Sequence, residues 1–160
     1  MALGYRLTIT DSKGGEIVLS SMKNEHQGKE DIIAASYKSN TLNDDAIARS
    51  NDVRAEIRVI GRITANNKKA TCDVANWSKE TDSDLIYRKV KLETYVSTSS
   101  SEMLRSYEIE NMFIIDYTEG YEIPTENFPS ENLNGENDNG LFELYLVQKN
   151  GNYDQYIEVE

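Results

Sequence analysis

Apolar and polar residues alternate along most of this chain, which is the pattern of β-strands that bury one face. Turn-forming residues such as Gly, Asn, Asp and Ser separate the alternating runs. The pattern predicts strands at residues 5–10, 16–20, 31–38, 53–63, 86–97, 102–110, 112–118, 141–149 and 153–160. A chain built almost entirely from such runs is expected to be mainly β.

The run 86–97 shows the alternation most clearly. Val90, Leu92 and Val96 mark its buried face, whereas the lysines and Glu93 mark an exposed face. The polar linker STSSS that follows predicts a hairpin into the next run, and the linkers DSKGG and NGN predict two more. The segment Met112–Ile115 is apolar on both faces, which predicts a central strand whose second face is covered by the helix, the other sheet or a neighbouring subunit.

One segment, Ala70–Glu80, has the spacing of a helix instead. Ala70, Val74 and Trp77 lie at positions i, i+4 and i+7, so they form one apolar stripe. Thr71 is a candidate N-cap, and Trp77 is expected to pack the helix against the sheet. The prediction is one domain over residues 1–160, a β-barrel or sandwich with one flanking helix. Long polar loops are expected at about 21–30 and 39–52, and an acidic loop at about 123–140.

The charge is unevenly distributed. The 160 residues carry a net charge of −11; residues 1–99 hold 15 Lys and Arg against 14 Asp and Glu, and residues 100–160 hold 2 against 14. This balance argues against sequence-specific binding of nucleic acid through a basic patch. It also predicts that acids of one copy meet bases of another. The candidate acids are Glu119, Glu122, Glu126, Glu131 and Glu136, and the candidate bases are Arg49, Arg54, Lys68 and Lys69.

Other features narrow the location and the chemistry. No apolar run has the roughly 20 residues of a membrane helix, so no membrane insertion is expected. The N-terminus lacks the pattern of a secretory signal, and a single cysteine is consistent with synthesis in the cytoplasm. No motif of a serine hydrolase, zinc protease or nucleotide-binding protein is present, so no catalytic, cofactor or metal site is expected.

Three candidate positions for chemistry remain. His26 lies in a polar loop and is expected to be a solvated surface residue. Cys72 lies near the predicted helix start, where the helix dipole would lower its pKa. Asp116 and Glu119 lie beside a predicted strand end, although acidic pairs are expected by chance in so acidic a chain.

The order of the predicted elements resembles a known family. The segments Ala48-Arg49-Ser50, Tyr87-Arg88-Lys89-Val90 and Asn111 to Glu119 are similar to a family of small clostridial and related Gram-positive proteins. That family resembles the tube proteins of contractile injection systems and phage tails. The last segment also resembles late strands of the haemolysin-coregulated protein of type VI secretion. The likeness covers roughly residues 48–122 and the run FELYLVQK.

The resemblance implies a structural protein without enzymatic activity. It implies a haemolysin-coregulated-protein-like β-barrel that forms hexameric rings, which stack into a hollow tube within a phage-tail-like particle. Sheath, baseplate and cargo proteins are the implied partners, besides further copies of the chain. Two alternatives stay open, a monomeric β-sandwich that binds a ligand through its long loops and an uncharacterised hydrolase. The candidate subunit-contact residues are Ile32, Ile33, Tyr37, Arg49, Arg54, Tyr107, Met112, Ile114, Tyr117, Glu119 and Glu122.

Overall fold

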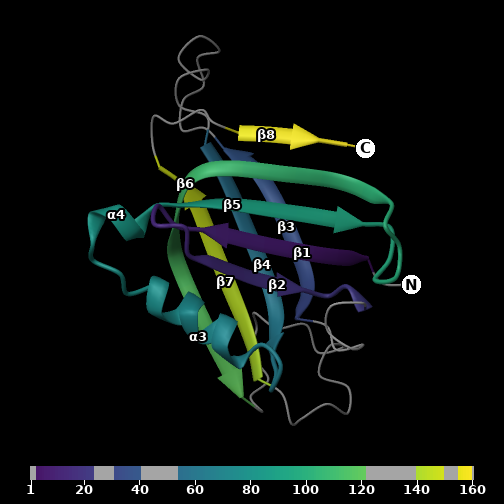
Figure 1. Ribbon diagram of the computed structural model, residues 1–160, viewed down its shortest axis with the longest axis horizontal. Helices are drawn as coiled ribbons and strands as arrows, with labels where there is room; N and C mark the ends of the chain where they lie inside the picture. Colours follow the sequence, from purple (N-terminus) through teal and green to yellow (C-terminus); the bar gives the residue numbers. More distant parts are fainter. Residues whose placement is uncertain (1–2, 24–30, 41–53, 122–139, 150–154, 160) are drawn as a thin grey trace.

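The computed structural model describes residues 3–23, 31–40, 54–121, 140–149 and 155–159. They form strands and two helices (Figure 1). In chain order the elements are β1 (Gly4–Thr10), β2 (Glu16–Ser20), β3 (Ile32–Asn40), β4 (Arg54–Ile63), α3 (Lys68–Trp77), α4 (Ser83–Ile86), β5 (Arg88–Tyr95), β6 (Met103–Tyr121), β7 (Gly140–Gln148) and β8 (Gln155–Glu158). The prediction of a mainly β chain is confirmed.

All eight strands belong to one antiparallel sheet with the order β2-β1-β5-β6-β7-β4-β3, and β8 pairs with β6 beside this path. The sheet is open and folds back on itself, so that β2, β1 and β5 run across the direction of β7, β4 and β3 (Figure 1). The long strand β6 belongs to both halves. Its first half pairs with β5 up to Met112, and its second half pairs with β7 from Met112 onwards. Asn111, with a φ of 57°, lies at this changeover.

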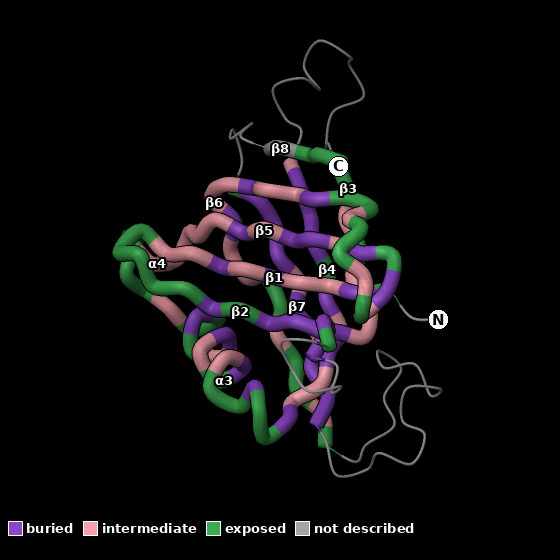
Figure 2. Tube along the Cα trace, turned by 45° about the vertical axis from the view of Figure 1, so that its right-hand side comes forward, coloured by how far each residue is buried: buried purple, intermediate pink, exposed green. Residues whose placement is uncertain are grey.

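The core lies between the two halves of the folded sheet. Leu7 and Leu92 come from the β1–β5 side, whereas Ile57, Phe142 and Leu144 come from the β4–β7 side, and all five are at most 1% exposed. Figure 2 shows the buried positions running through both halves of the sheet. At roughly 25 cal/mol per Å² of apolar surface, this burial is the main stabilising term of the fold.

The helix begins and ends earlier than the sequence predicts. Thr71, the predicted N-cap, lies inside α3 and is buried, and the capping position belongs to Asn67. Trp77 packs as predicted: its side chain is 4% exposed, and its indole N–H donates a hydrogen bond of 2.8 Å to the carbonyl of Ile86. The prediction of a single helix is wrong, because the four residues of α4 form a second one, in which the Asp82 side chain caps the N-terminus.

Three predictions about the strands are also wrong. The runs 102–110 and 112–118 form one continuous strand, β6, because the bulge-like residue Asn111 bends the strand without ending it. The closing hairpin around NGN does not form, since β8 pairs with β6 and not with β7. Val96 was expected to be buried, but it follows the end of β5 and is 39% exposed.

Asp31 and Gly61 fix the junction between β3, β4 and α3. The buried Asp31 carboxylate accepts hydrogen bonds from the Ser20 backbone N–H at 3.0 Å and from the Asn67 side-chain amide at 2.8 Å. The Asp31 carbonyl lies so close to Gly61 that a Cβ there would be 2.0 Å from it. Within the described residues, no helix is both long and apolar enough to cross a membrane.

Candidate subunit-contact surfaces

Two strand edges of one half of the sheet have no partner among the described strands. This half-sheet consists of residues 112–121 of β6 together with β7, β4 and β3. β3 pairs only with β4, and the second half of β6 pairs only with β7. The two open edges therefore lie on opposite sides of the half-sheet. Each edge presents a row of backbone N–H and C=O groups that a further strand can pair with.

The strand directions allow this half-sheet to repeat. Every neighbouring pair in it is antiparallel, so β6 and β4 run one way while β7 and β3 run the other. β3 of one copy can therefore pair in the antiparallel sense with β6 of a second copy that has the same orientation. With nine residues at about 3.4 Å each, β3 offers an edge of roughly 30 Å.

The predicted contact residues on β3 occupy two different environments. Ile32 is only 1% exposed and belongs to the core of the single chain. Ile33 and Tyr37 are half-buried. The ring of Tyr37 stacks on Tyr107 with centroids 4.5 Å apart, so the two halves of the sheet touch here. Burial raises the pKa of Tyr37 above its usual value.

The predicted residues on β6 are similarly divided. Met112 is fully buried, whereas Ile114 and Tyr117 are half-buried against the core cluster. A bulge between Ile114 and Asp116 shifts the register with β7 and leaves Ile115 47% exposed. The segment Met112–Ile115 is thus not covered on both faces in a single chain, and the predicted cover by a neighbouring subunit stays a prediction.

Glu119 is already engaged within its own chain. Its carboxylate oxygens accept hydrogen bonds from the hydroxyls of Tyr117 at 2.8 Å and Tyr121 at 2.9 Å. Burial, followed by this hydrogen bond, raises the pKa of Tyr117 strongly, and the hydrogen bond is the main cause that raises the pKa of Tyr121. The ring of Tyr121 lies against Gly140, where a Cβ would be 2.5 Å from it. Because both of its carboxylate oxygens are already hydrogen-bonded, Glu119 is less available to pair with a base on another copy than the charge count alone indicates.

The remaining predicted charges are scattered. Arg54 is half-buried at the start of β4, opposite Asn40, and Lys68 and Lys69 are exposed in the first turn of α3. Several predictions fall outside the described residues: Arg49, Glu122, Glu126, Glu131 and Glu136, together with His26 and nearly all of the three long loops. For these residues the predictions stay untested.

An apolar strip at the edge of the sheet adds one residue that is not named from the sequence, Ile157, to the predicted contact residues Tyr37 and Tyr107. Ile157 of β8 is 46% exposed and faces Tyr107 across the strand pair, and Tyr107 in turn stacks on Tyr37. We call these three residues the aromatic strip. The sequence signal was present, because Ile157 alternates with acids, but its exposure depends on the pairing of β8 with β6.

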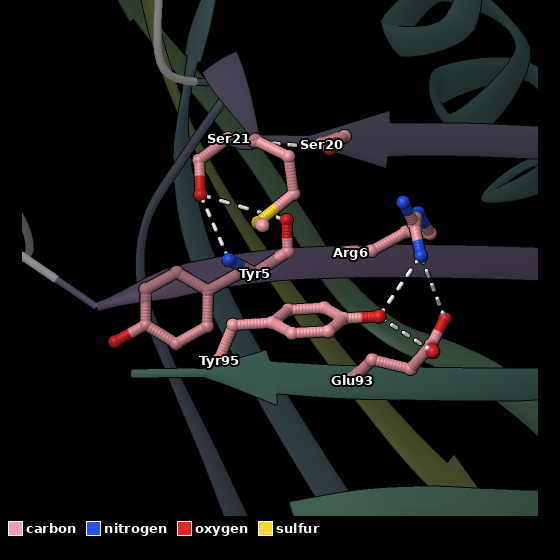
Figure 3. A network of polar contacts seen from close by, with 7 residues as sticks. Tyr5, Arg6, Ser20, Ser21, Glu93 and Tyr95 are labelled. Atoms are coloured by element: carbon pink, nitrogen blue, oxygen red, sulfur yellow. Dashed lines mark hydrogen bonds and ion pairs between the residues drawn. The ribbon is translucent and has the colours of Figure 1, made fainter. Parts of the chain in front are cut away.

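A polar network covers the opposite face of β1 and β5. The Arg6 guanidinium donates a hydrogen bond of 2.9 Å to the Tyr95 hydroxyl, which donates one of 2.8 Å to Glu93 (Figure 3). Arg6 Nη1 also lies 3.5 Å from Glu93 Oε1. The predicted exposure of Glu93 is wrong: the residue is 8% exposed, and its charge is tolerated there because it is paired.

Two hollows lie at the two ends of the β1–β5 layer. The first, the Arg6 hollow, has a volume of about 520 Å³ and lies between Lys23 and the turn that joins β5 to β6. The second, the helix hollow, has a volume of about 400 Å³ and lies between the β1–β2 turn and α3. Arg88 lies in the helix hollow with its guanidinium 5.0 Å from the centre of the Trp77 ring, and burial lowers its pKa.

The candidate residues for hydrolysis are not assembled. Cys72 is exposed in the interior of α3, not at its start, and its Sγ accepts a 3.7 Å contact from the Asn76 side chain. Asp116 pairs in register with Tyr145 and Glu119 with Phe142, so the two acids point to opposite faces of the sheet. Among the described residues, no group of three or more His, Cys, Asp or Glu side chains is arranged to hold a metal ion.

Comparisons with known proteins identify the fold. No family model matches the chain, and no curated protein matches it. Among solved structures, a mutated form of the Hcp1 protein from the E. coli EAEC 042 pathovar is similar, with a TM-score of 0.55, 10% identity and coverage of 98% of each chain. The anti-feeding prophage tube-terminating cap has a TM-score of 0.47, 10% identity, and coverage of 97% of this chain and 89% of that chain. The predicted Hcp-like fold is confirmed by the Hcp1 comparison.

Proposed function

We propose that this chain is a structural tube subunit, whose copies join side by side into rings that stack into a conduit. The observation that carries the proposal is the half-sheet with open edges on opposite sides. It is supported by the Hcp-like fold, which extends over 98% of the chain. On this proposal the chain forms part of the wall of the conduit, a role that requires no catalytic residue.

The ring contact follows from the strand directions. The β3 edge of one copy pairs with the second half of β6 in the next, so that four strands per copy continue as one antiparallel sheet. Such a contact joins two different surfaces and therefore closes a ring when the rotation between copies returns to the start. Closure also removes the exposed strand edges. The resemblance implies six subunits in each ring, with sheath, baseplate and cargo proteins as further partners.

The aromatic strip and Ile115 supply the apolar part of this contact. Tyr37 lies on β3, and Ile115 protrudes from the bulge on β6, so each open edge carries a large, partly exposed side chain. Ile32 and Met112 act indirectly, because they anchor the two edge strands to the core. Apolar and aromatic side chains at the centre of an interface carry most of its binding energy.

Sedimentation velocity over a wide range of protein concentration tests the proposal. The expected result is a closed oligomer that is resistant to dilution, with larger species formed from it. A chain that sediments as a monomer at every concentration would favour the alternative, a monomeric binding module in which the Arg6 hollow is the natural ligand site.

A further inference from the structure

The two hollows lie on opposite sides of the molecule, along the same direction as the two open edges. The Arg6 hollow is at the end of β1 where the strand begins, and the helix hollow is at the end where β1 turns into β2. In Figure 1 the start of β1 lies at the right and α3 at the lower left, while β3 and the second half of β6 lie on the right and left sides of the half-sheet. If β3 of one copy meets β6 of the next, the Arg6 hollow of the first copy faces the helix hollow of the second.

The Arg6 hollow presents positive charge and hydrogen-bond donors. It is lined by two bases, Arg6 and Lys23, against one acid, Glu93. Arg6 and Glu93 form an ion pair with each other, so the net positive charge that the hollow shows to a partner is carried by Lys23. Lys23 is exposed at the rim, together with the serine-rich turn of residues 98–101.

The helix hollow presents the opposite charge. Four acids line it, against two bases. One of the bases, Lys69, already forms an ion pair with Asp73 at 3.1 Å, and the other, Arg88, is half-buried on the Trp77 ring. The acids that line it are Asp11, Glu16, Asp73 and Glu80.

We propose, on the basis of the ring proposed above, that the helix hollow of one copy docks against the Arg6 hollow of its neighbour as a second, electrostatic layer of the subunit contact. The occupant of each hollow is thus a second copy of this chain. Opposite charges on the two surfaces fix the direction of the contact, because a pairing of like hollows brings equal charges together. The charges therefore determine which side of one copy meets which side of the next, in addition to the pairing of the strand edges.

Charge reversal with rescue tests the docking. Lys23→Glu makes the Arg6 hollow acidic, and Glu16→Lys cancels the net charge of the helix hollow, leaving three acids against three bases; both residues are exposed, so folding should be retained. We expect each single change to raise the concentration needed for half-assembly by about fivefold, and the double variant to assemble better than Lys23→Glu alone, because a neutral helix hollow no longer repels the acidic Arg6 hollow. The difference between variants should vanish in 1 M salt, where the Debye length is only about 3 Å.

Lys91→Glu is the matched control for Lys23→Glu. It makes the same change of charge, but Lys91 lies in the middle of β5 and lines neither hollow. It should assemble as the unmodified chain does. The docking is contradicted if both single variants assemble normally, or if the double variant assembles no better than Lys23→Glu alone. These outcomes differ from a failure of the ring itself, in which the unmodified chain stays monomeric and neither proposal survives.

Discussion

The hydroxyl of Tyr95 donates a hydrogen bond of 2.8 Å to the carboxylate of Glu93, two residues away on the same face of β5. Both residues are buried, at 7% and 8% exposed. This pair allows a carboxylate to be buried on the face that the alternation of the sequence assigns to solvent. It also makes the stability of the fold sensitive to alkaline pH.

Burial, together with the Glu93 hydrogen bond, raises the pKa of Tyr95 to about 12. The unfolded chain releases this proton from about pH 10, whereas the folded chain retains it. Deprotonation therefore favours the unfolded state, and the free energy of unfolding should fall between about pH 10 and pH 12. In Tyr95→Phe the group is absent, so the fall should be shallower. Melting temperatures from pH 9 to 11.5 measure this, with Tyr107→Phe as the control; equal slopes for Tyr95→Phe and the unmodified chain would refute the assignment.

Trp77→Ala should lower the free energy of unfolding by about 3–5 kcal/mol. The indole is 4% exposed, donates a hydrogen bond to Ile86 and supports the guanidinium of Arg88, so its removal leaves a cavity and unpaired groups. Urea unfolding measures the change. The control is Asn76→Ala on the exposed side of the same helix, which should cost less than about 0.5 kcal/mol. A loss below about 1 kcal/mol for Trp77→Ala would show that the helix does not hold the sheet.

Gly61→Ala should cost at least about 2 kcal/mol, because a Cβ there would lie 2.0 Å from the backbone carbonyl of Asp31 and 2.5 Å from the Phe142 ring. The backbone cannot yield as a flexible side chain would. Thermal unfolding of the variant, beside Ser36→Ala on the exposed part of β3, checks this. An unchanged melting temperature would mean that β3 and β4 are farther apart at this point.

Ile115→Lys separates assembly from stability. Because the side chain of Ile115 is 47% exposed in the single chain, the substitution should change the free energy of unfolding by less than about 0.5 kcal/mol. It should nevertheless weaken self-association. Ile114→Lys is the comparison: Ile114 packs against the core, so that variant should lose stability as well. The role of Ile115 is disproved if its variant assembles at the same concentration as the unmodified chain.

The sequence predicts the strands well because alternation is a local property. Leu7, Ile57 and Leu92 are buried where the period of two places them. The pairing of β8 with β6, in contrast, is not local, because it joins residues 155–158 to residues 106–109, which lie far earlier in the chain. The burial of Glu93 is equally invisible in the sequence, because it depends on Arg6, 87 positions away in the chain but adjacent across β1 and β5.

The charge count predicts too simple a picture of the candidate surfaces. It places the acids of residues 100–160 opposite the bases of residues 1–99. In the described part of the fold, Glu119 is held by two tyrosines of its own chain, whereas the most acidic hollow is built from residues before position 99. The net charge of a segment depends only on its composition, whereas the fold determines which charged side chains lie on the same surface.

Negative-stain electron microscopy of the purified chain tests the central claim most directly, because a ring and a monomer differ in outline. Two open edges on opposite sides of a four-stranded half-sheet predict annular particles with a central hole in end views, and stacks of such rings in side views. Compact particles of monomer size at every concentration, or sheet-like aggregates without closure, would contradict the account.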